Sequence, residues 1–234
     1  MLKALFLLLK FAKLGKVAMS GGSMLLSILV YGSLYGWVYG VGLVMLLFVH
    51  ELGHYAAARQ RGLAVGLPAF IPFVGAWVAL KDRIPNAETE AYVGIAGPAA
   101  GTLGAVACYF LAGDGNKTLL AISYAGFMIN LFNLLPISPL DGGRITTVLS
   151  PRIWLLGVPL LVGLYFLQHS PILLIIGILG IPKAWAAWQG RLDEAPEYWQ
   201  VSMADRISYG AMYIALVAGL ALISYDLHRQ LSGG

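Results

Sequence analysis

Charged residues are scarce in this sequence: aspartate, glutamate, lysine and arginine make up 11% of its 234 residues, against about 25% in an average soluble domain. Hydrophobic residues make up 59%, and the mean hydropathy is +0.78. This composition excludes a water-soluble globular protein, and it also excludes a disordered chain, whose signature is low hydrophobicity. The single cysteine, Cys108, excludes an intramolecular disulfide. The composition is that of an integral membrane protein.

Long stretches without any charged residue divide the sequence. They lie at residues 17–49, 91–113, 118–140, 153–182 and 207–225. Since about 20 apolar residues cross the hydrocarbon core as a helix, we predict an all-α polytopic membrane protein with six to seven transmembrane helices. The expected spans are residues 24–36, 37–58, 91–112, 118–139, 153–168, 171–188 and 207–225. The first hydrophobic run, residues 24–60, is too long for one span, and its glycines offer a place to turn: Gly32, Gly36, Gly40 and Gly42.

The positions of the basic residues favour two spans within this first run. With two spans, all 15 lysines and arginines except Lys117 and Arg229 lie on one side of the membrane. With one span, the four N-terminal lysines change sides and the asymmetry is largely lost. The positive-inside rule therefore predicts a cytoplasmic N-terminus and an external C-terminus. Because the basic residues are scattered between apolar runs, we expect no nucleic-acid partner.

Two segments outside these spans carry predictions of their own. Residues 1–20 contain an apolar core of only six residues, too short for a cleavable signal peptide. We expect an interfacial amphipathic helix with its lysines toward anionic lipid. Residues 63–84 mix glycine and proline with β-forming residues, which predicts a small β-hairpin or a re-entrant segment around 63–81. Such a segment would either pack on the bundle or pair with an extended peptide.

The stretch His50-Glu51-Leu52-Gly53-His54 is the most informative feature of the sequence. Positions i and i+4 share one face of a helix, so both imidazoles reach one metal ion. Glu51 is then placed to take a proton from a water molecule at that metal. The motif ends an uncharged apolar run, and ionisable residues at membrane depth are costly and usually functional. It therefore predicts a metal site inside the membrane.

A catalytic zinc ion usually takes three protein ligands and leaves one position for water. Asp141 is the best candidate for the third ligand, because it ends the stretch NLLPISPLD, whose prolines prevent a regular helix. Irregular backbone at membrane depth is tolerated where it is buried or lines a wet cavity. Two alternatives are that Asp141 only pairs with Arg144, and that His169 is the third ligand. His228 lies beyond the last expected span.

Two asparagines precede Asp141 in the same apolar run. The amide of Asn133 would either hold a substrate carbonyl and the developing oxyanion or hydrogen-bond another helix. Asn130, one turn earlier, is expected to serve helix packing. The glycines of Gly97-Pro98-Ala99-Ala100-Gly101 are spaced by four residues, a spacing that permits close contact between helices.

Taken in order, HELGH at 50–54, GPAAG at 97–101 and NLLPISPLDGG at 133–143 resemble the motifs of the site-2 protease family of intramembrane zinc metalloproteases. Members of that family cut transmembrane segments of other proteins near the cytosolic face, often to release a regulator. The resemblance covers nearly 100 residues and suggests a short form of the family without PDZ or CBS domains.

For this chain, the resemblance implies a core of three helices around one Zn²⁺ per chain. The zinc ligands that it implies are His50, His54 and Asp141. It likewise implies Glu51 as the catalytic acid/base and Asn133 as a substrate-contacting group. The chain departs from the usual pattern at two positions, since Ser138 stands where a proline is common and Gly101 where an asparagine is often found.

We therefore expect one membrane-embedded protease domain over residues 1–234. In this domain residues 24–60 end in the HELGH motif, 91–141 complete the metal site, and 153–188 and 207–225 add further helices. The expected function is an intramembrane zinc endopeptidase that hydrolyses a peptide bond within or near a transmembrane segment of a membrane protein substrate. The expected location is a prokaryotic cell membrane, with the active site toward the cytoplasm and in contact with the lipid bilayer.

Two alternatives stay open on the sequence alone. A membrane zinc peptidase of another family would be expected to take a glutamate from a later helix as its third ligand. A non-enzymatic metal transporter or membrane adaptor is the other alternative. A transporter would show polar residues through several spans, whereas the polar residues here gather at one depth.

Overall fold

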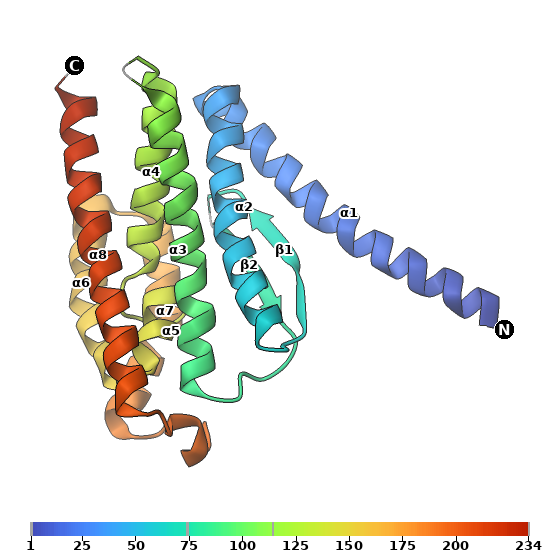
Figure 1. The fold of residues 1–234 in the computed structure, drawn as a ribbon, viewed down its shortest axis with the longest axis vertical. Helices are drawn as coiled ribbons and strands as arrows, with labels where there is room; N and C mark the ends of the chain where they lie inside the picture. Colours follow the sequence, from blue (N-terminus) through green and yellow to red (C-terminus); the bar gives the residue numbers. More distant parts are fainter. Residues whose placement is uncertain (1, 74, 114, 234) are drawn as a thin grey trace.

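The computed structural model describes residues 2–73, 75–113 and 115–233, with side chains described from residue 18 onward. Within these ranges the chain forms eight α-helices and one two-stranded antiparallel sheet (Figure 1). The helices are α1 (Leu2–Tyr35), α2 (Trp37–Gln60), α3 (Ala87–Ala112), α4 (Lys117–Asn133), α5 (Asp141–Thr147), α6 (Trp154–Gln168), α7 (Pro171–Gln189) and α8 (Met203–Ser232). The strands are β1 (Val65–Ile71) and β2 (Gly75–Leu80), and two 3₁₀ turns follow, η1 (Pro151–Ile153) and η2 (Pro196–Trp199).

Six stretches in the described residues are long and apolar enough to cross a membrane. They lie at Ala18–Tyr35, Trp37–Gln60, Ala87–Ala112, Pro151–Gln168, Pro171–Gln189 and Met203–Ser232. The shorter α4, with 17 residues, packs against α2, α3 and α8. The chain is a multi-pass membrane protein, and the predicted all-α polytopic fold with a small β-hairpin is confirmed.

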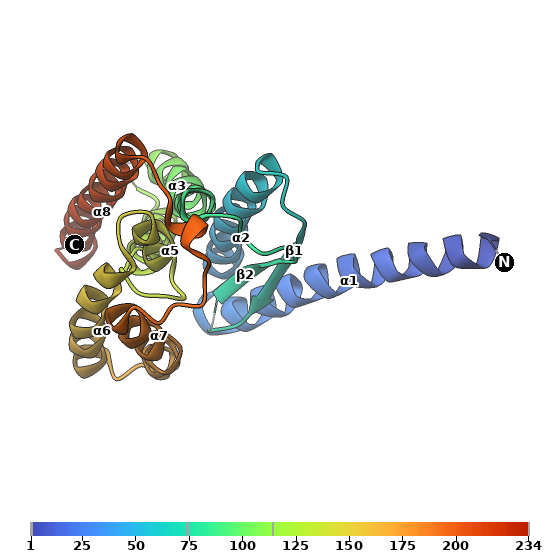
Figure 2. The same cartoon turned by 90° about the horizontal axis from the view of Figure 1, so that it is seen from below.

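The first hydrophobic run turns at Gly36. This residue alone separates α1 from α2, and its φ of +93° lies in the left-handed region that glycine adopts without strain. The predicted turn within residues 24–60 is therefore confirmed. The helix before it is continuous from Leu2 to Tyr35 rather than divided near residue 20, and its N-terminal half projects away from the bundle (Figure 2). The predicted orientation of its lysines toward lipid concerns side chains outside the described residues.

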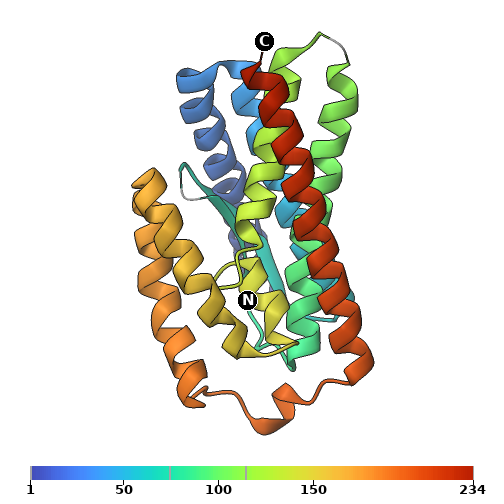
Figure 3. The ribbon, with the colours of Figure 1, turned by 90° about the vertical axis from the view of Figure 1, so that its left-hand side faces the viewer.

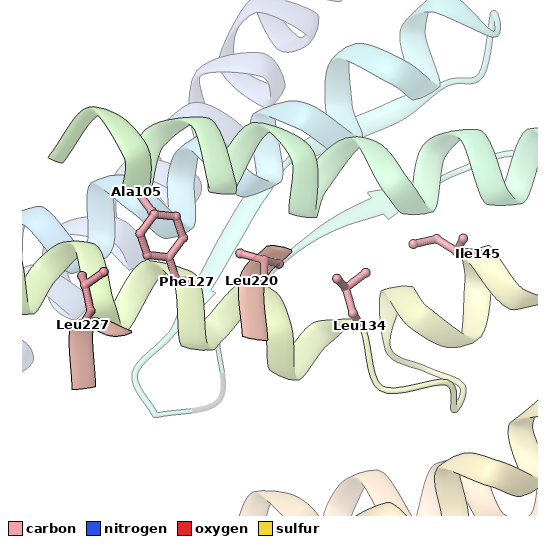
Figure 4. Close-up of a cluster of buried hydrophobic side chains, with 6 residues drawn as sticks. All are labelled: Ala105, Phe127, Leu134, Ile145, Leu220 and Leu227. Atoms are coloured by element: carbon pink, nitrogen blue, oxygen red, sulfur yellow. The ribbon is translucent and has the colours of Figure 1, made fainter. Parts of the chain in front are cut away.

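Helix α3 packs against both α2 and α4 (Figure 1). Buried side chains from α3, α4, α5 and α8, together with Leu134, form a hydrophobic cluster. Its members are Ala105, Phe127, Leu134, Ile145, Leu220 and Leu227 (Figure 4). Burial of this apolar surface holds α5 against α3 and α4. Other large apolar side chains, such as those of Leu103, Phe110 and Ile178, are more than 70% exposed. That exposure suits a surface that faces lipid.

Helix α4 ends at Asn133, so the predicted span to residue 139 was too long. Pro136 explains this end, because its ring excludes the carbonyl of Phe132 and disfavours helical backbone at Leu135. The chain then crosses residues 134–140 without regular structure and enters α5 at Asp141. The helical hairpin α6–α7 lies on the side of this segment that is away from α3 (Figure 3). The 190–202 connection leads from α7 to α8.

The predicted hairpin around 63–81 is confirmed. β1 and β2 pair in antiparallel register, with Ala69 opposite Trp77 and Phe70 opposite Ala76. Helix α1 packs against β1, and α2 packs against both strands. The hairpin therefore lies beside the helix that carries the HELGH motif.

Candidate metal centre and active site

Helix α2 carries His50, Glu51 and His54 into the interior of the bundle. His50 is 4% exposed, Glu51 5% and His54 6%. Glu51 lies nine residues before the end of α2, or about 14 Å along the helix axis at about 1.5 Å per residue. The three polar side chains therefore lie at membrane depth, where ionisable groups need partners.

Asp141 completes a cluster with the two histidines. His50 Nε2 lies 3.1 Å from Asp141 Oδ2, and His54 Nε2 lies 3.2 Å from Asp141 Oδ1. The two Nε2 atoms are 3.2 Å apart. A tetrahedral zinc site with metal–ligand distances of about 2.0–2.1 Å has its ligand atoms about 3.3–3.4 Å apart. The observed spacing is close to this value, so the three residues are positioned to bind one metal ion.

Both histidines are held in the tautomer that binds metal through Nε2. His54 Nδ1 donates to the carbonyl oxygen of Val93 at 2.7 Å. His50 Nδ1 lies 2.7 Å from Asn130 Oδ1 and donates to it, since the Asn130 amide nitrogen itself donates to Gly126 O at 2.8 Å. A proton on each Nδ1 leaves a lone pair on each Nε2. Such outer partners orient histidine ligands in metal sites.

This donor set has the chemistry of a divalent cation site. Two imidazole lone pairs and a carboxylate, all of them hydrogen-bond acceptors, face one another at 3.1–3.2 Å. Acceptors brought this close repel unless a cation or protons lie between them. Imidazole and carboxylate ligands in tetrahedral spacing suit Zn²⁺. Arg144 is the more distant partner of Asp141, at 3.8 Å, so an Asp141–Arg144 pair is not the closest contact of this carboxylate.

Glycines let the backbone approach the metal centre closely. A Cβ atom at Gly97 would lie 2.2 Å from His54 Nε2, and one at Gly101 would lie 2.4 Å from Asn130 Oδ1. On α5, a Cβ at Gly142 would lie 2.1 Å from the carbonyl oxygen of Leu134. The GPAAG and LDGG sequences therefore leave the space in which the histidines, Asn130 and Asp141 meet.

A cavity of about 490 Å³ opens onto the cluster. Glu51 and Asn133 line it, together with the backbone segment that precedes Asp141. Its other walls come from β2, with Trp77 and Val78, and from an apolar face of α7. The α7 residues are Ile172, Ile175, Ile176 and Leu179. The lining of the cavity is thus mainly apolar, and it includes the metal ligands and Glu51.

The structure separates the predicted site residues from their rivals. The same cavity is lined by all five predicted site residues, His50, Glu51, His54, Asn133 and Asp141. The rival ligands lie elsewhere. His169 is exposed at the turn between α6 and α7, and His228 is exposed on α8, 3.4 Å from the Tyr124 hydroxyl.

Sequence reasoning missed Asn130 as part of the centre. It assigned this residue to helix packing, whereas the structure places its side chain on His50 Nδ1. The sequence evidence for this contact was weak, because an asparagine in an apolar helix is equally typical of a packing contact between helices. Only the relative position of α2 and α4 distinguishes the two roles.

Comparison with known proteins matches the part of the chain around the HELGH motif to metallopeptidases. Residues 38–117 match the model of peptidase family M50, a stretch that contains the HELGH helix and α3 and ends before Asp141. A zinc metalloprotease of Methanocaldococcus jannaschii is 35% identical over 113 residues, covering 44% of this chain and 32% of that protein.

Two further relatives show similar coverage. A probable chloroplastic zinc metalloprotease of Arabidopsis thaliana is 30% identical over 192 residues, covering 55% of this chain and 34% of the relative. A putative zinc metalloprotease of Mycobacterium tuberculosis is 30% identical over 128 residues, covering 49% and 32%. The matched region therefore spans about a third of the length of each of these relatives.

Proposed function

Because this chain belongs to peptidase family M50 through residues 38–117, we propose that it is an intramembrane zinc endopeptidase. It hydrolyses a peptide bond within or near a transmembrane segment of another membrane protein. The observation that carries the proposal is the convergence of His50, His54 and Asp141 beside Glu51, in the lining of a mainly apolar cavity.

The residues of the cavity divide the chemistry of hydrolysis between them. A Zn²⁺ ion held by the two histidines and Asp141 would polarise the scissile carbonyl and lower the pKa of a water molecule toward about 7. Glu51 accepts a proton from the attacking water and delivers it to the leaving amide nitrogen as the C–N bond breaks. The Asn133 side chain donates a hydrogen bond to the carbonyl oxygen of the substrate, which strengthens as negative charge develops there.

The lining of the cavity by β2 supports an extended substrate. A helix satisfies its own backbone groups, so a transmembrane helix must unwind before its peptide bonds can be attacked. One edge of β2 pairs with β1, and β2 also lines the cavity. In this proposal the β2 backbone pairs with an unwound segment by strand addition, while the apolar side chains of β2 and α7 contact the side chains of that segment.

The distribution of basic residues supports a cytoplasmic active site. Most of them lie where α2 and α7 end and where α3 and α8 begin, at one end of the bundle (Figure 1). Glu51 is in the C-terminal half of α2 and is therefore nearer to this end. They are Arg59, Arg61, Lys81, Arg83, Arg152, Lys183, Arg191 and Arg206. Lys117 and Arg229 lie at the opposite end. By the positive-inside rule, the end near Glu51 faces the cytoplasm, and the expected setting is a prokaryotic cell membrane.

The proposal is tested in proteoliposomes that contain the full chain and a single-span membrane protein with tags on both ends. We expect cleavage by the wild type and none by Glu51→Gln, which keeps the shape of the side chain but removes the base. Zinc content stays at one ion per chain in both, because Glu51 is not among the ligand atoms. Glu197→Gln, an exposed glutamate in η2, is the matched control and should cleave normally.

Cleavage by Glu51→Gln at the wild-type rate would overturn the mechanism. The alternatives predict different results. Transport of zinc into liposomes without cleavage of any test substrate would support a metal transporter. A zinc content that survives Asp141→Ala would indicate another third ligand, as in a zinc peptidase that uses a glutamate from a later helix.

A further inference from the structure

Asn130 is buried between the metal centre and the α3–α4 contact. Asn130 is 2% exposed. Its side chain accepts a hydrogen bond from His50 Nδ1 at 2.7 Å and donates one to Gly126 O at 2.8 Å. We propose that Asn130 is a positioning residue, which holds the His50 ring in the orientation and tautomer that bind the metal. The proposal rests on the zinc site of the proposed function and adds a residue that touches neither metal nor substrate.

The orientation of the Asn130 amide follows from its second partner. Gly126 O is a carbonyl and only accepts, so the amide nitrogen must face it and the amide oxygen must face His50. The oxygen in turn only accepts, so His50 Nδ1 must carry a proton. The lone pair of His50 is thereby placed on Nε2, which lies 3.1 Å from Asp141 and 3.2 Å from His54 Nε2.

The position of this amide depends on Gly101 of α3. A Cβ atom at residue 101 would lie 2.4 Å from Asn130 Oδ1 and 2.8 Å from Asn130 Nδ2. Any side chain at this position would push the amide away from His50. Gly101 and Asn130 therefore act together, since the glycine leaves the space that the asparagine occupies.

Without Asn130, the His50 ring has lost its acceptor at Nδ1. The ring can then rotate or carry its proton on Nε2 instead of Nδ1, and either change withdraws the Nε2 lone pair from the metal. Loss of the Asn130 side chain should therefore lower metal affinity. Loss of such a hydrogen-bond partner typically weakens metal binding by about 10–100-fold. The zinc dissociation constant is therefore the quantity to measure, and it requires no substrate.

The experiment measures zinc affinity of the full chain in detergent, by competition with a chromophoric chelator. Asn130→Leu keeps the branched shape of the side chain and removes both hydrogen bonds, and we expect affinity to fall about 10–100-fold. Ser123→Ala is the matched control, because it removes another buried hydrogen bond between α4 and α3, from Ser123 Oγ to Ala105 O at 2.8 Å. Its zinc affinity should stay within about threefold of wild type.

A conservative replacement and the Gly101 variant separate positioning from general damage. The neutral carboxyl group of Asn130→Asp offers an oxygen to His50 Nδ1 and a hydroxyl to Gly126 O, so it should keep affinity within about threefold of wild type. Gly101→Ala should weaken zinc binding as Asn130→Leu does, and the double variant should be no weaker than either, because both remove one contact. Gly104→Ala is its control, since the atoms nearest to a Cβ there belong to the Leu46 and Val49 side chains, at 3.0 Å or more.

The outcomes are distinguishable from a failure of the proposed function. A wild-type chain that binds no zinc would overturn the metal centre itself. A wild-type chain that binds zinc while Asn130→Leu binds it equally well would overturn only the role of Asn130. If Asn130→Leu does not fold, Asn130→Asp and Gly101→Ala test the role of Asn130 in its place. The proposal expects tighter zinc binding by Asn130→Asp than by Gly101→Ala, so equal zinc affinities of these two variants would contradict it.

Discussion

His54 and Gly97 are in contact across the α2–α3 interface, so closely that a Cβ atom at residue 97 would lie 2.2 Å from His54 Nε2. No real Cβ comes this near a ring nitrogen, so the imidazole occupies its metal-binding position because residue 97 is a glycine. The contact explains why α3, which provides no metal ligand, is needed for the metal centre. It also gives the GPAAG sequence a role beyond close packing of helices.

Gly97→Ala is therefore expected to displace the His54 ring and abolish tight zinc binding while the helices remain. Zinc content of the purified variant, together with its circular dichroism spectrum, measures both effects. Gly104→Ala, two turns along the same helix, should bind zinc normally. A Gly97→Ala chain that keeps a full complement of zinc would show that α3 moves away from α2 at little cost.

Asp141→Ala should weaken zinc binding by more than about 100-fold, beyond the range for partners that only orient a ligand. The reason is that the two histidines would be left as the only members of the cluster. Equilibrium dialysis against buffered zinc measures the loss. Asp226→Ala, at an exposed position on α8, is the control and should bind one zinc ion per chain.

Trp77→Ala tests the role of β2 in binding substrate. Trp77 lines the cavity and is 46% exposed, so its ring is available for apolar contact with a bound segment. Loss of about 1–1.5 kcal/mol of such contact should raise KM about fivefold to tenfold and leave kcat within about twofold. Trp185→Ala, an exposed tryptophan of α7 away from the cavity lining, should leave KM unchanged. An unaltered KM for Trp77→Ala would argue against substrate binding along β2.

Tyr198→Phe tests how the 190–202 connection is held to the bundle. The Tyr198 hydroxyl in η2 donates to the carboxylate of Glu90 on α3, and removing it leaves a half-buried carboxylate without this donor. Hydrogen bonds to charged groups contribute about 1.5–3 kcal/mol, so the thermal midpoint should fall by several degrees. Tyr225→Phe, whose ring is 65% exposed, should melt like the wild type.

The same hydrogen bond has a predictable dependence on pH. Burial raises the pKa of Tyr198 above its ordinary value near 10, and the Glu90 carboxylate raises it further. A pKa raised by folding means that the stabilisation is fully present below about pH 10 and is lost as the pH rises through the folded-state pKa. The difference in thermal midpoint between wild type and Tyr198→Phe should therefore be constant from pH 6 to about pH 9. A difference that vanishes within that range would contradict the assignment.

Several features were predictable from the sequence because they depend on local chemistry. The spacing of His50 and His54 places both on one helical face wherever that helix lies. The hairpin follows from glycine, proline and β-forming residues between two charged clusters, and Gly36 is a natural end for a helix. The predicted span over 118–139 was too long, because Pro136 stops α4 near Asn133 even though the apolar run continues.

The sequence by itself determined that the chain is a multi-pass membrane protein with a metal-binding motif in its second long helix, since hydrophobicity and helical periodicity are properties of the chain alone. The contacts between helices were decided by the tertiary structure. Asn130 reaches His50 across 80 residues of sequence, and Gly97 and Gly101 gain their roles from the side chains opposite them. These roles depend on how closely and at what rotation α2, α3 and α4 pack, which many residues set together.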